Sequence, residues 1–257
     1  MKTDRSLRER LAAGETVFGT LVNTPAGGLI EIMGHAGLDF VVLDTEHGPL
    51  SIETCEDLLR SVSSAGMSSI IRILANEPTL AQRALDIGAG GIQVPQVQSR
   101  SDAQLAVQGA KYSPLGLRGL SPFVRAGQYG AGIVGMTERA NQETMVVVHI
   151  EGHLAVKAAD EILGVEGLDV IFLGPFDLSL SLGVPGQVEH PRVMEMMRSV
   201  AEKTRSAGKT LGAFAKDVQG AKKLMDLGVR YLVYGVDVGV YLDAWRERVS
   251  ALKGQNG

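Results

Sequence analysis

Eight short apolar runs recur along the chain, and each is followed by a longer stretch in which apolar residues have helical spacing. This alternation constrains the fold more than any other feature, because strands that alternate with helices build βαβ units and a parallel sheet. The runs are nearly continuous in Val, Ile, Leu and Phe, which is typical of strands buried on both faces. They cover residues 16–22, 40–44, 69–73, 91–95, 145–151, 170–174, 210–215 and 231–236.

Eight such units in 257 residues, with no linker or change in composition between them, favour one α/β domain. We predict a single (β/α)8 TIM barrel over residues 1–257. The alternative is a doubly wound open sheet, but no Gly-x-Gly-x-x-Gly motif follows the first run. Helices are predicted to follow Ser51 as an N-cap and to cover 191–207, 217–227 and 238–252. The irregular stretch 112–138 is rich in Gly and Pro, as functional or subunit-contacting loops often are.

Composition excludes several classes of function. The chain has 25 Lys and Arg against 29 Asp and Glu, so it lacks a basic surface for nucleic acid. No apolar run reaches the roughly 20 residues of a membrane span, and the charged first residues lack the apolar segment of a signal peptide. Cys55 is the one cysteine, which rules out an intramolecular disulfide or a cysteine zinc cluster. We therefore expect a cytoplasmic protein without nucleic-acid or membrane partners.

Polar side chains close five of the eight apolar runs. In a TIM barrel the C-terminal ends of the strands carry the chemistry, so these side chains are predicted to share the barrel mouth. The segments are 44–47, Arg72, 93–96, 149–153 and 174–177.

Two carboxylates, Glu151 and Asp177, end neighbouring runs. With waters and a chelating substrate they would form an all-oxygen site suited to Mg²⁺ or Mn²⁺. The competing interpretation is that each carboxylate caps the helix that follows it.

His47 and Arg72 are candidates for acid–base and anion-binding roles. His47 follows Asp44 and Glu46, and a neighbouring carboxylate can fix the tautomer of a general base. Arg72 in an apolar strand suits a substrate carboxylate or a developing enolate. The simpler interpretations are an exposed loop histidine and a structural ion pair of Arg72 with Asp44 or Glu46.

Three further residues carry weaker signals. His149 shares a strand face with Glu151 and is expected to support that carboxylate by a hydrogen bond, or to be a core histidine, rather than to bind metal directly. Lys216 raises the alternative of a Schiff-base aldolase, but it is expected to be a solvated loop residue. Cys55 is a weak candidate nucleophile.

At this point the sequence resembles the HpcH/HpaI aldolase/citrate lyase family, over roughly residues 7 to 250. The resemblance rests on Leu-Asp-Thr-Glu-His-Gly-Pro at 43–49, on Arg72, on Ile150-Glu151 and on Gly-Pro-Phe-Asp-Leu-Ser-Leu-Ser-Leu-Gly at 174–183. The segment Tyr-Ser-Pro-Leu-Gly-Leu-Arg-Gly at 112–119 adds to it.

The resemblance implies a metal-dependent class II aldolase, a carbon–carbon lyase on a TIM barrel. Such enzymes cleave 4-hydroxy-2-oxo acids reversibly, through a metal-stabilised enolate, to pyruvate or a related 2-oxo acid and an aldehyde. It also implies a homohexamer, built as a trimer of dimers, in which the last helix is exchanged between subunits. The resemblance also gives roles to the residues that match the family motifs. Glu151 and Asp177 would bind a divalent metal (Mg²⁺ or Mn²⁺, with Co²⁺ as a third option), and His47, oriented by Asp44, would be the base. Arg72 would bind the 2-oxo acid, and the backbone around Gly174, Phe176 and Asp177 would hold its carboxylate.

Some residues depart from the family pattern. The family commonly has glutamine where His149 stands, so His149 is expected to affect metal affinity or the binding of the 2-oxo acid. Ser113 replaces a proline, and the segment after Gly119 is unusual. We predict that Phe123, Arg125 and Tyr129 in that segment select the aldehyde, or else pack on a neighbouring subunit.

Two other function classes remain open. One is a citrate-synthase-like or malyl/citryl-CoA lyase-type enzyme that uses a CoA thioester, although no clear basic cluster for CoA phosphates is present. The other is a non-catalytic binding barrel, which would not need a base beside a metal site.

Overall fold

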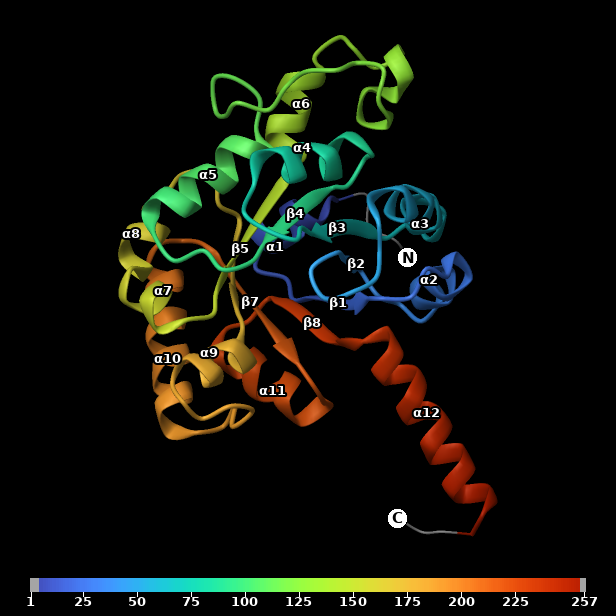
Figure 1. Ribbon diagram of the computed structural model, residues 1–257, viewed down its shortest axis with the longest axis vertical. Coiled ribbons are helices and arrows are strands. Elements are labelled where there is room, and N and C mark those ends of the chain that lie inside the picture. Colours follow the sequence, from blue (N-terminus) through green and yellow to red (C-terminus); the bar gives the residue numbers. More distant parts are fainter. Residues whose placement is uncertain (1–4, 255–257) are drawn as a thin grey trace.

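Eight parallel strands close into a barrel in the order β1-β2-β3-β4-β5-β6-β7-β8 (Figure 1). The computed structural model describes residues 5–254. The predicted strand bounds agree with the observed ones to within one residue, so the single TIM barrel is confirmed. The strands are β1 (Val17–Val22), β2 (Phe40–Asp44), β3 (Ser68–Arg72), β4 (Gly91–Val94), β5 (Met145–Ile150), β6 (Val170–Leu173), β7 (Thr210–Ala215) and β8 (Tyr231–Val236).

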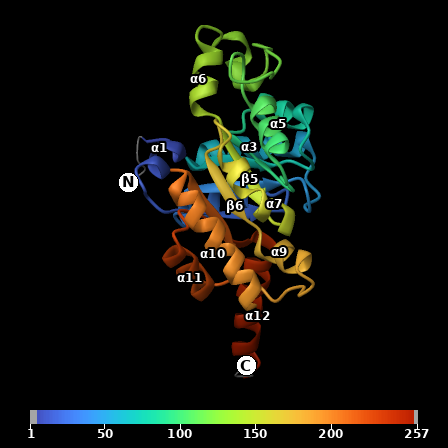
Figure 2. The ribbon, with the colours of Figure 1, turned by 90° about the vertical axis from the view of Figure 1, so that its left-hand side faces the viewer.

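Most helices follow a strand and surround the barrel, whereas α1 precedes β1 and α12 extends away from the barrel (Figures 1 and 2). They are α1 (Leu7–Ala12), α2 (Gly27–His35), α3 (Ile52–Ala65), α4 (Pro78–Asp86), α5 (Arg100–Ala110), the 3₁₀ helix η1 (Arg125–Gly130), α6 (Met136–Glu143), α7 (His153–Lys157), α8 (Ala159–Leu163), α9 (Pro175–Ser181), α10 (Pro191–Ser206), α11 (Val218–Leu227) and α12 (Asp237–Leu252).

The helix termini follow local capping chemistry. The Ser51 hydroxyl accepts a hydrogen bond from the backbone N–H of Thr54 at the start of α3, as predicted. Asp217 caps α11 by accepting from the N–H of Gly220, and α11 ends at Gly228, whose φ of 105° favours glycine. The helical stretches predicted from periodicity are therefore helices α3, α10, α11 and α12.

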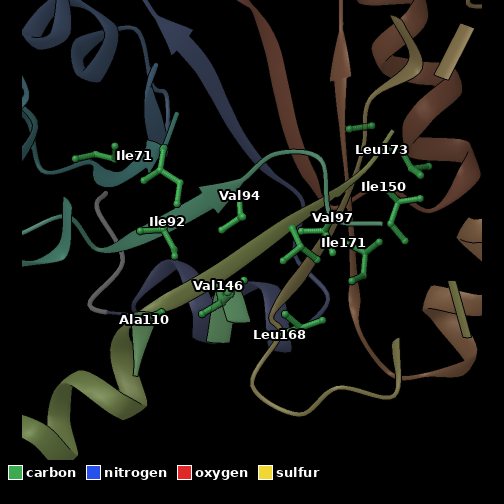
Figure 3. Close-up of a cluster of buried hydrophobic side chains, with 14 of the residues drawn as sticks. Ile71, Ile92, Val94, Val97, Ala110, Val146, Ile150, Leu168, Ile171 and Leu173 are labelled. Carbon is green, nitrogen blue, oxygen red and sulfur yellow. The ribbon is translucent and has the colours of Figure 1, made fainter. Parts of the chain in front are cut away.

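Two apolar layers lie on the two faces of the barrel wall. Between strands and helices, residues such as Ile92, Val94 and Val146 form the larger cluster (Figure 3). Inside the barrel, the alternate residues Phe40, Val42, Ile70, Val147, Phe172 and Tyr231 pack together, and Leu7 and Leu11 of α1 join them. Because side chains alternate along a strand, the residues that continue the inner series at the C-terminal ends must face the barrel mouth.

Two segments project at opposite ends of the molecule (Figures 1 and 2). One is the segment between α5 and β5; it was predicted as irregular up to residue 138, but it contains η1 and the start of α6. The other is α12, which extends away from the barrel and leaves the rings of Tyr241 and Trp245 more than half exposed. Among the described helices, none has the length and apolar character needed to cross a bilayer.

Candidate active site

A cavity of about 410 Å³ lies at the C-terminal ends of the strands. Asp44, Arg72 and His149 line it because each stands two residues after an inward-facing residue of its strand. Of the residues predicted to share the barrel mouth, the eight that were assigned a catalytic or binding role all line this one cavity: Asp44, His47, Arg72, His149, Glu151, Gly174, Phe176 and Asp177.

Arg72 lies between two carboxylates at the base of the cavity. Its Nε and Nη2 donate to Oδ1 and Oδ2 of Asp44 at 2.8 and 2.6 Å, and its Nη1 lies 3.1 Å from Oε2 of Glu46. Burial alone would raise the pKa of Asp44, but the hydrogen bonds and charge of Arg72 outweigh it, so this pKa is lowered. For Glu46 burial dominates and raises the pKa, with Arg72 offsetting part of the effect. The ion pair considered from the sequence is therefore present with both carboxylates, and it fixes the guanidinium in the cavity.

The His47 imidazole is not oriented by Asp44, and this corrects the prediction. Asp44 Oδ1 accepts hydrogen bonds from the backbone N–H groups of Glu46 and His47, at 3.0 and 3.3 Å. The other contacts of its two oxygens are with Arg72, and within residues 5–254 no hydrogen bond joins Asp44 to the imidazole. The His47 side chain is 69% exposed, and the nearest carboxylate is Glu46, with 3.9 Å between Nε2 and Oε2. Asp44 thus shapes the loop that carries His47, while the imidazole stays free to meet a substrate.

A buried chain of hydrogen bonds leads from the barrel interior to Glu151. The hydroxyl of Tyr231 donates to Oε1 of Gln93 at 3.2 Å, and Nε2 of Gln93 lies 2.7 Å from Nε2 of His149. Nδ1 of His149 lies 2.7 Å from Oε2 of Glu151. Since the Gln93 amide nitrogen can only donate, Nε2 of His149 accepts and Nδ1 carries the proton that bonds Glu151. His149 therefore supports the carboxylate, as one of the sequence interpretations expected.

Glu151 remains an anion at the edge of this chain. Burial alone would raise its pKa, but the interaction with His149, the backbone N–H of Gln96 and the charge of Arg72 outweigh it and lower the pKa. Gln96 donates to Oε1 at 2.7 Å, so each oxygen of Glu151 accepts one hydrogen bond and keeps a further lone pair. The carboxylate is thus both oriented and able to accept a cation.

The two predicted metal ligands, Glu151 and Asp177, line the same cavity. Neither is a helix cap, because Gly152 and Gly174 occupy the N-cap positions of α7 and α9. Asp177 lies in the first turn of α9 rather than at a strand end, and it is exposed to solvent. In residues 5–254 no group of three or more His, Cys, Asp and Glu side chains is placed to hold a metal. Two carboxylates at an open cavity fit a hard cation that takes its other ligands from water and substrate.

Only glycine fits at position 174 without displacing a neighbouring side chain. A Cβ atom built on it would lie 2.7 Å from Cβ of Glu151 and 2.9 Å from its Oε2. Any larger residue would therefore displace the Glu151 carboxylate.

The predicted selectivity residues Phe123, Arg125 and Tyr129 lie away from this cavity in the same chain. Arg125 donates to the carbonyl of Ile87 and to the hydroxyl of Ser63, while the rings of Phe123 and Tyr129 are 75% and 62% exposed. Their segment borders a different cavity, of about 370 Å³, at the N-terminal ends of β3, β4 and β5. One chain therefore does not bring these residues to its own barrel mouth.

The two alternative nucleophiles differ in setting. Cys55 is fully buried, and burial raises the pKa of its thiol to about 12, which makes it unreactive. Lys216 is exposed and lines the cavity, as expected of a solvated residue rather than of a desolvated Schiff-base lysine.

Gln93 and Asn23, which line the cavity, and the buried Tyr231 were not assigned a role from the sequence. Gln93 was visible as a polar residue in a buried strand, and strand alternation is the signal that could have assigned it an inward side chain. Tyr231 gave no signal, because it meets Gln93 only across the closed barrel. Asn23 lines the cavity from the end of β1, its backbone N–H is held by Asp237, and its buried Oδ1 has no partner in the part of the chain described.

The chain is similar to known proteins over nearly its whole length. The model of the HpcH/HpaI aldolase/citrate lyase family matches residues 19–244. The 2-keto-3-deoxy-L-rhamnonate aldolase of Salmonella gallinarum is 32% identical, over 96% of this chain and 92% of that protein. The pyruvate aldolase of Rhizobium etli is 34% identical, over 91% of each chain. The crystal structure of the citrate synthase SbnG superposes with a TM-score of 0.88 at 33% identity, over 97% of this chain and 98% of that one.

The fold and the site thus define an (β/α)8 enzyme of the aldolase type, a lyase. The chain belongs to the HpcH/HpaI aldolase/citrate lyase family.

Proposed function

We propose that this chain is a divalent-metal-dependent class II aldolase. It cleaves a 4-hydroxy-2-oxo acid reversibly into pyruvate, or a related 2-oxo acid, and an aldehyde. The observation that carries the proposal is the single barrel-mouth cavity in which Arg72, Glu151, Asp177 and an exposed His47 meet. The names of the two aldolase relatives support it.

Glu151 and Asp177 would hold the cation, Mg²⁺ or Mn²⁺, through carboxylate oxygens. When bound, the cation supplies Lewis acidity toward the 2-oxo group of the substrate. The chain's own contribution is to fix Glu151 through His149 and Gln96 and to keep it ionised. His149 acts on the metal ligand and so affects how the 2-oxo acid is held.

Arg72 would bind the 2-oxo acid and stabilise negative charge on its oxygens. A guanidinium has five N–H donors. Two are hydrogen-bonded to Asp44, and Nη1 lies 3.1 Å from Oε2 of Glu46, so at least two donors remain for substrate. Because the carboxylates of Asp44 and Glu46 fix the planar guanidinium, its remaining N–H donors are oriented before the substrate binds. The first-turn N–H groups of Phe176 and Asp177, next to Gly174, are the proposed contacts for the substrate carboxylate.

His47 would move the proton. In cleavage its imidazole takes the proton from the C4 hydroxyl, the C3–C4 bond breaks, the aldehyde leaves, and the electron pair forms the enolate of the 2-oxo acid. Protonation at C3 then gives pyruvate. In condensation the steps run in reverse, beginning with removal of a C3 proton.

Exchange of the pyruvate methyl protons in D₂O tests the proposal without any knowledge of the aldehyde. We expect NMR to show deuteration by the purified protein, loss with EDTA, and recovery with Mg²⁺ or Mn²⁺. Asp177→Asn should lower the exchange and also weaken Mn²⁺ binding measured by calorimetry. Absence of exchange with every metal would refute a pyruvate aldolase.

The similarity to the citrate synthase SbnG favours a second candidate, a lyase or synthase that joins an acyl donor to a 2-oxo acid. The same enolate-forming residues would serve that reaction. Release of free CoA thiol from acetyl-CoA in the presence of oxaloacetate, with no pyruvate exchange, would select it over the aldolase.

We further propose that the chain assembles with copies of itself through α12, as a hexamer built from dimers. The exposed apolar side chains of this helix, Tyr241, Trp245, Val249 and Leu252, would be covered by a neighbouring subunit. Light scattering should give a multiple of the 27.3 kDa chain mass, and a monomer would refute the assembly.

A further inference from the structure

Asn23 brings a side-chain amide to the barrel mouth, and the chain itself does not use this amide. Asn23 stands two residues after the inward-facing Leu21 of β1 and lines the same cavity as Arg72. The residue is half-buried, its Oδ1 is fully buried, and within residues 5–254 neither atom of the amide has a hydrogen-bond partner. Since buried polar groups are nearly always hydrogen-bonded, an amide left free in a cavity indicates a partner that comes from outside the chain.

The backbone of Asn23 is fixed although its amide is free. Oδ1 of the buried Asp237 accepts from the backbone N–H of Asn23 at 3.0 Å, and Oδ2 accepts from that of Thr24 at 2.9 Å. Oδ1 of Asp237 also accepts from the N–H of Val238, so the end of β1 is tied to the start of α12. The amide is therefore carried to the cavity from a rigid position, which is what a preorganised functional group needs.

The amide lies beside the loop that carries His47. A Cβ atom built on Gly48 would lie 3.1 Å from Oδ1 and 3.3 Å from Cγ of Asn23. In the closed strand order β1 and β2 stand opposite β5 and β6, so the amide and the imidazole face Glu151 and Asp177 across the cavity. A 2-oxo acid held on the side of the two carboxylates thus extends its further carbon atoms toward the imidazole and the amide together.

We propose that Asn23 is a further catalytic residue, whose Nδ2 donates a hydrogen bond to the C4 oxygen of the substrate. The inference rests on the proposed aldolase function. A hydroxyl oxygen can accept from Nδ2 while its own proton bonds the imidazole of His47, so both side chains can bind the same group.

The C4 oxygen gains negative charge in both directions of the reaction. In cleavage its proton passes to His47, the oxygen becomes the carbonyl of the aldehyde, and the C3–C4 electron pair passes to the 2-oxo acid as its enolate. In condensation the amide polarises the aldehyde carbonyl, C3 attacks it, and the proton on His47 goes to the new C4 oxygen. A fixed donor at this oxygen lowers the barrier to both reactions, but it has no part in the removal of a C3 proton from pyruvate alone.

Addition of pyruvate to propanal tests the assignment, because the one oxygen of propanal becomes the C4 hydroxyl. Pyruvate methyl exchange in D₂O without aldehyde measures enolate formation in the same samples. Asn23→Ala and Asn23→Leu both remove the donor, and leucine keeps the branched shape of the side chain. Each variant should lower kcat for addition about 100-fold, as the loss of one oxyanion donor does, while pyruvate exchange should stay close to the wild-type rate.

Asn76→Ala is the matched control. Asn76 is a half-buried asparagine in the loop after β3, outside the cavity lining, and its amide donates to the carbonyl of Asp102. The ratio of addition to exchange in this variant should equal that of wild type.

A second aldehyde, glycolaldehyde, carries an additional hydroxyl group. If Asn23→Ala and Asn23→Leu impair addition only to glycolaldehyde, the amide binds that substituent and the proposal is overturned. Wild-type addition to propanal in both variants would also overturn it, and so would an equal loss of addition and exchange, which would place the amide on the 2-oxo acid. A wild-type protein that exchanges pyruvate protons but adds neither aldehyde would overturn it as well. Absence of exchange in wild type itself would instead refute the aldolase.

Discussion

The chain of hydrogen bonds that supports Glu151 begins at one hydroxyl group, and a comparison of two tyrosines can measure its value. Tyr231 is fully buried and its hydroxyl donates to Oε1 of Gln93 at 3.2 Å. Tyr112 is also buried, but among the described residues its hydroxyl has no hydrogen-bond partner. Replacement of each by phenylalanine removes one buried oxygen, in one case with a partner and in the other without.

The expected effects have opposite signs. Tyr231→Phe leaves the amide oxygen of Gln93 buried without a donor, which costs about 1–2 kcal/mol of unfolding free energy. Tyr112→Phe removes an unpaired polar group from a buried position, so the change should be neutral or stabilising by up to about 1 kcal/mol. Because each substitution removes one hydroxyl group of the same volume, the difference between the two variants reports the hydrogen bond rather than the lost volume.

Urea unfolding, followed at one fixed protomer concentration, measures both changes, because association would otherwise shift the apparent stability. A second measurement tests whether this series of hydrogen bonds affects the metal site. Without Tyr231 the Gln93 amide can rotate and no longer fixes the proton of His149 on Nδ1, so Mn²⁺ affinity should fall about tenfold. Tyr112→Phe should leave Mn²⁺ affinity unchanged. Equal destabilisation by the two substitutions, or wild-type Mn²⁺ affinity in Tyr231→Phe, would refute the reasoning.

Four further predictions follow from single contacts. Gly174→Ala should displace the Glu151 carboxylate and lower pyruvate exchange about 100-fold, with little change in circular dichroism; near-normal exchange would mean that the space is not limiting. Arg72→Lys keeps the charge but loses the planar fork, so exchange should fall about 100-fold, and full activity would argue against oriented donors. Burial holds the pKa of Lys111 at about 8, below its ordinary value, so between pH 8 and 10.5 the unfolded chain binds more protons than the folded one and the free energy of unfolding rises with pH. In urea titrations over this range, wild type should gain about 1–3 kcal/mol relative to Lys111→Met. A difference between the two proteins that does not change with pH would contradict this. Cys55 should not react with a thiol reagent at pH 8 in the folded protein and should react once in urea; rapid labelling of the folded protein would contradict its burial.

Most of the fold could be predicted because its signals are local. Continuous β-branched runs bounded by glycine gave all eight strands, and caps such as Ser51 and Asp217 gave helix ends. The start of α6 lay in the stretch predicted as irregular and the rest of it was not predicted as a helix, because its eight residues include only two apolar side chains, Met136 and Ala140, and show no apolar stripe.

The candidate site could be predicted only in part. Strand alternation brings Asp44, Arg72 and His149 to one cavity, so their proximity follows from the pattern. The pairing of carboxylates with basic side chains does not follow from the pattern. From the sequence, Asp44 could have bonded either His47 or Arg72, and in the structure it accepts hydrogen bonds from the guanidinium of Arg72. The predicted selectivity residue Phe123 shows a similar limit, because a sequence does not state toward which end of the barrel a long segment projects.

The closed barrel also determines how this protein can touch its neighbours. Each strand pairs on both sides, β1 with β2 and with β8, so within residues 5–254 no strand edge offers free backbone N–H and C=O groups to another chain. Strand addition and the aggregation that it seeds are therefore excluded for the folded barrel. Contacts between copies must be made by side chains on helices and loops, and a few substitutions on α12 or the segment before α6 could redesign them without altering the barrel.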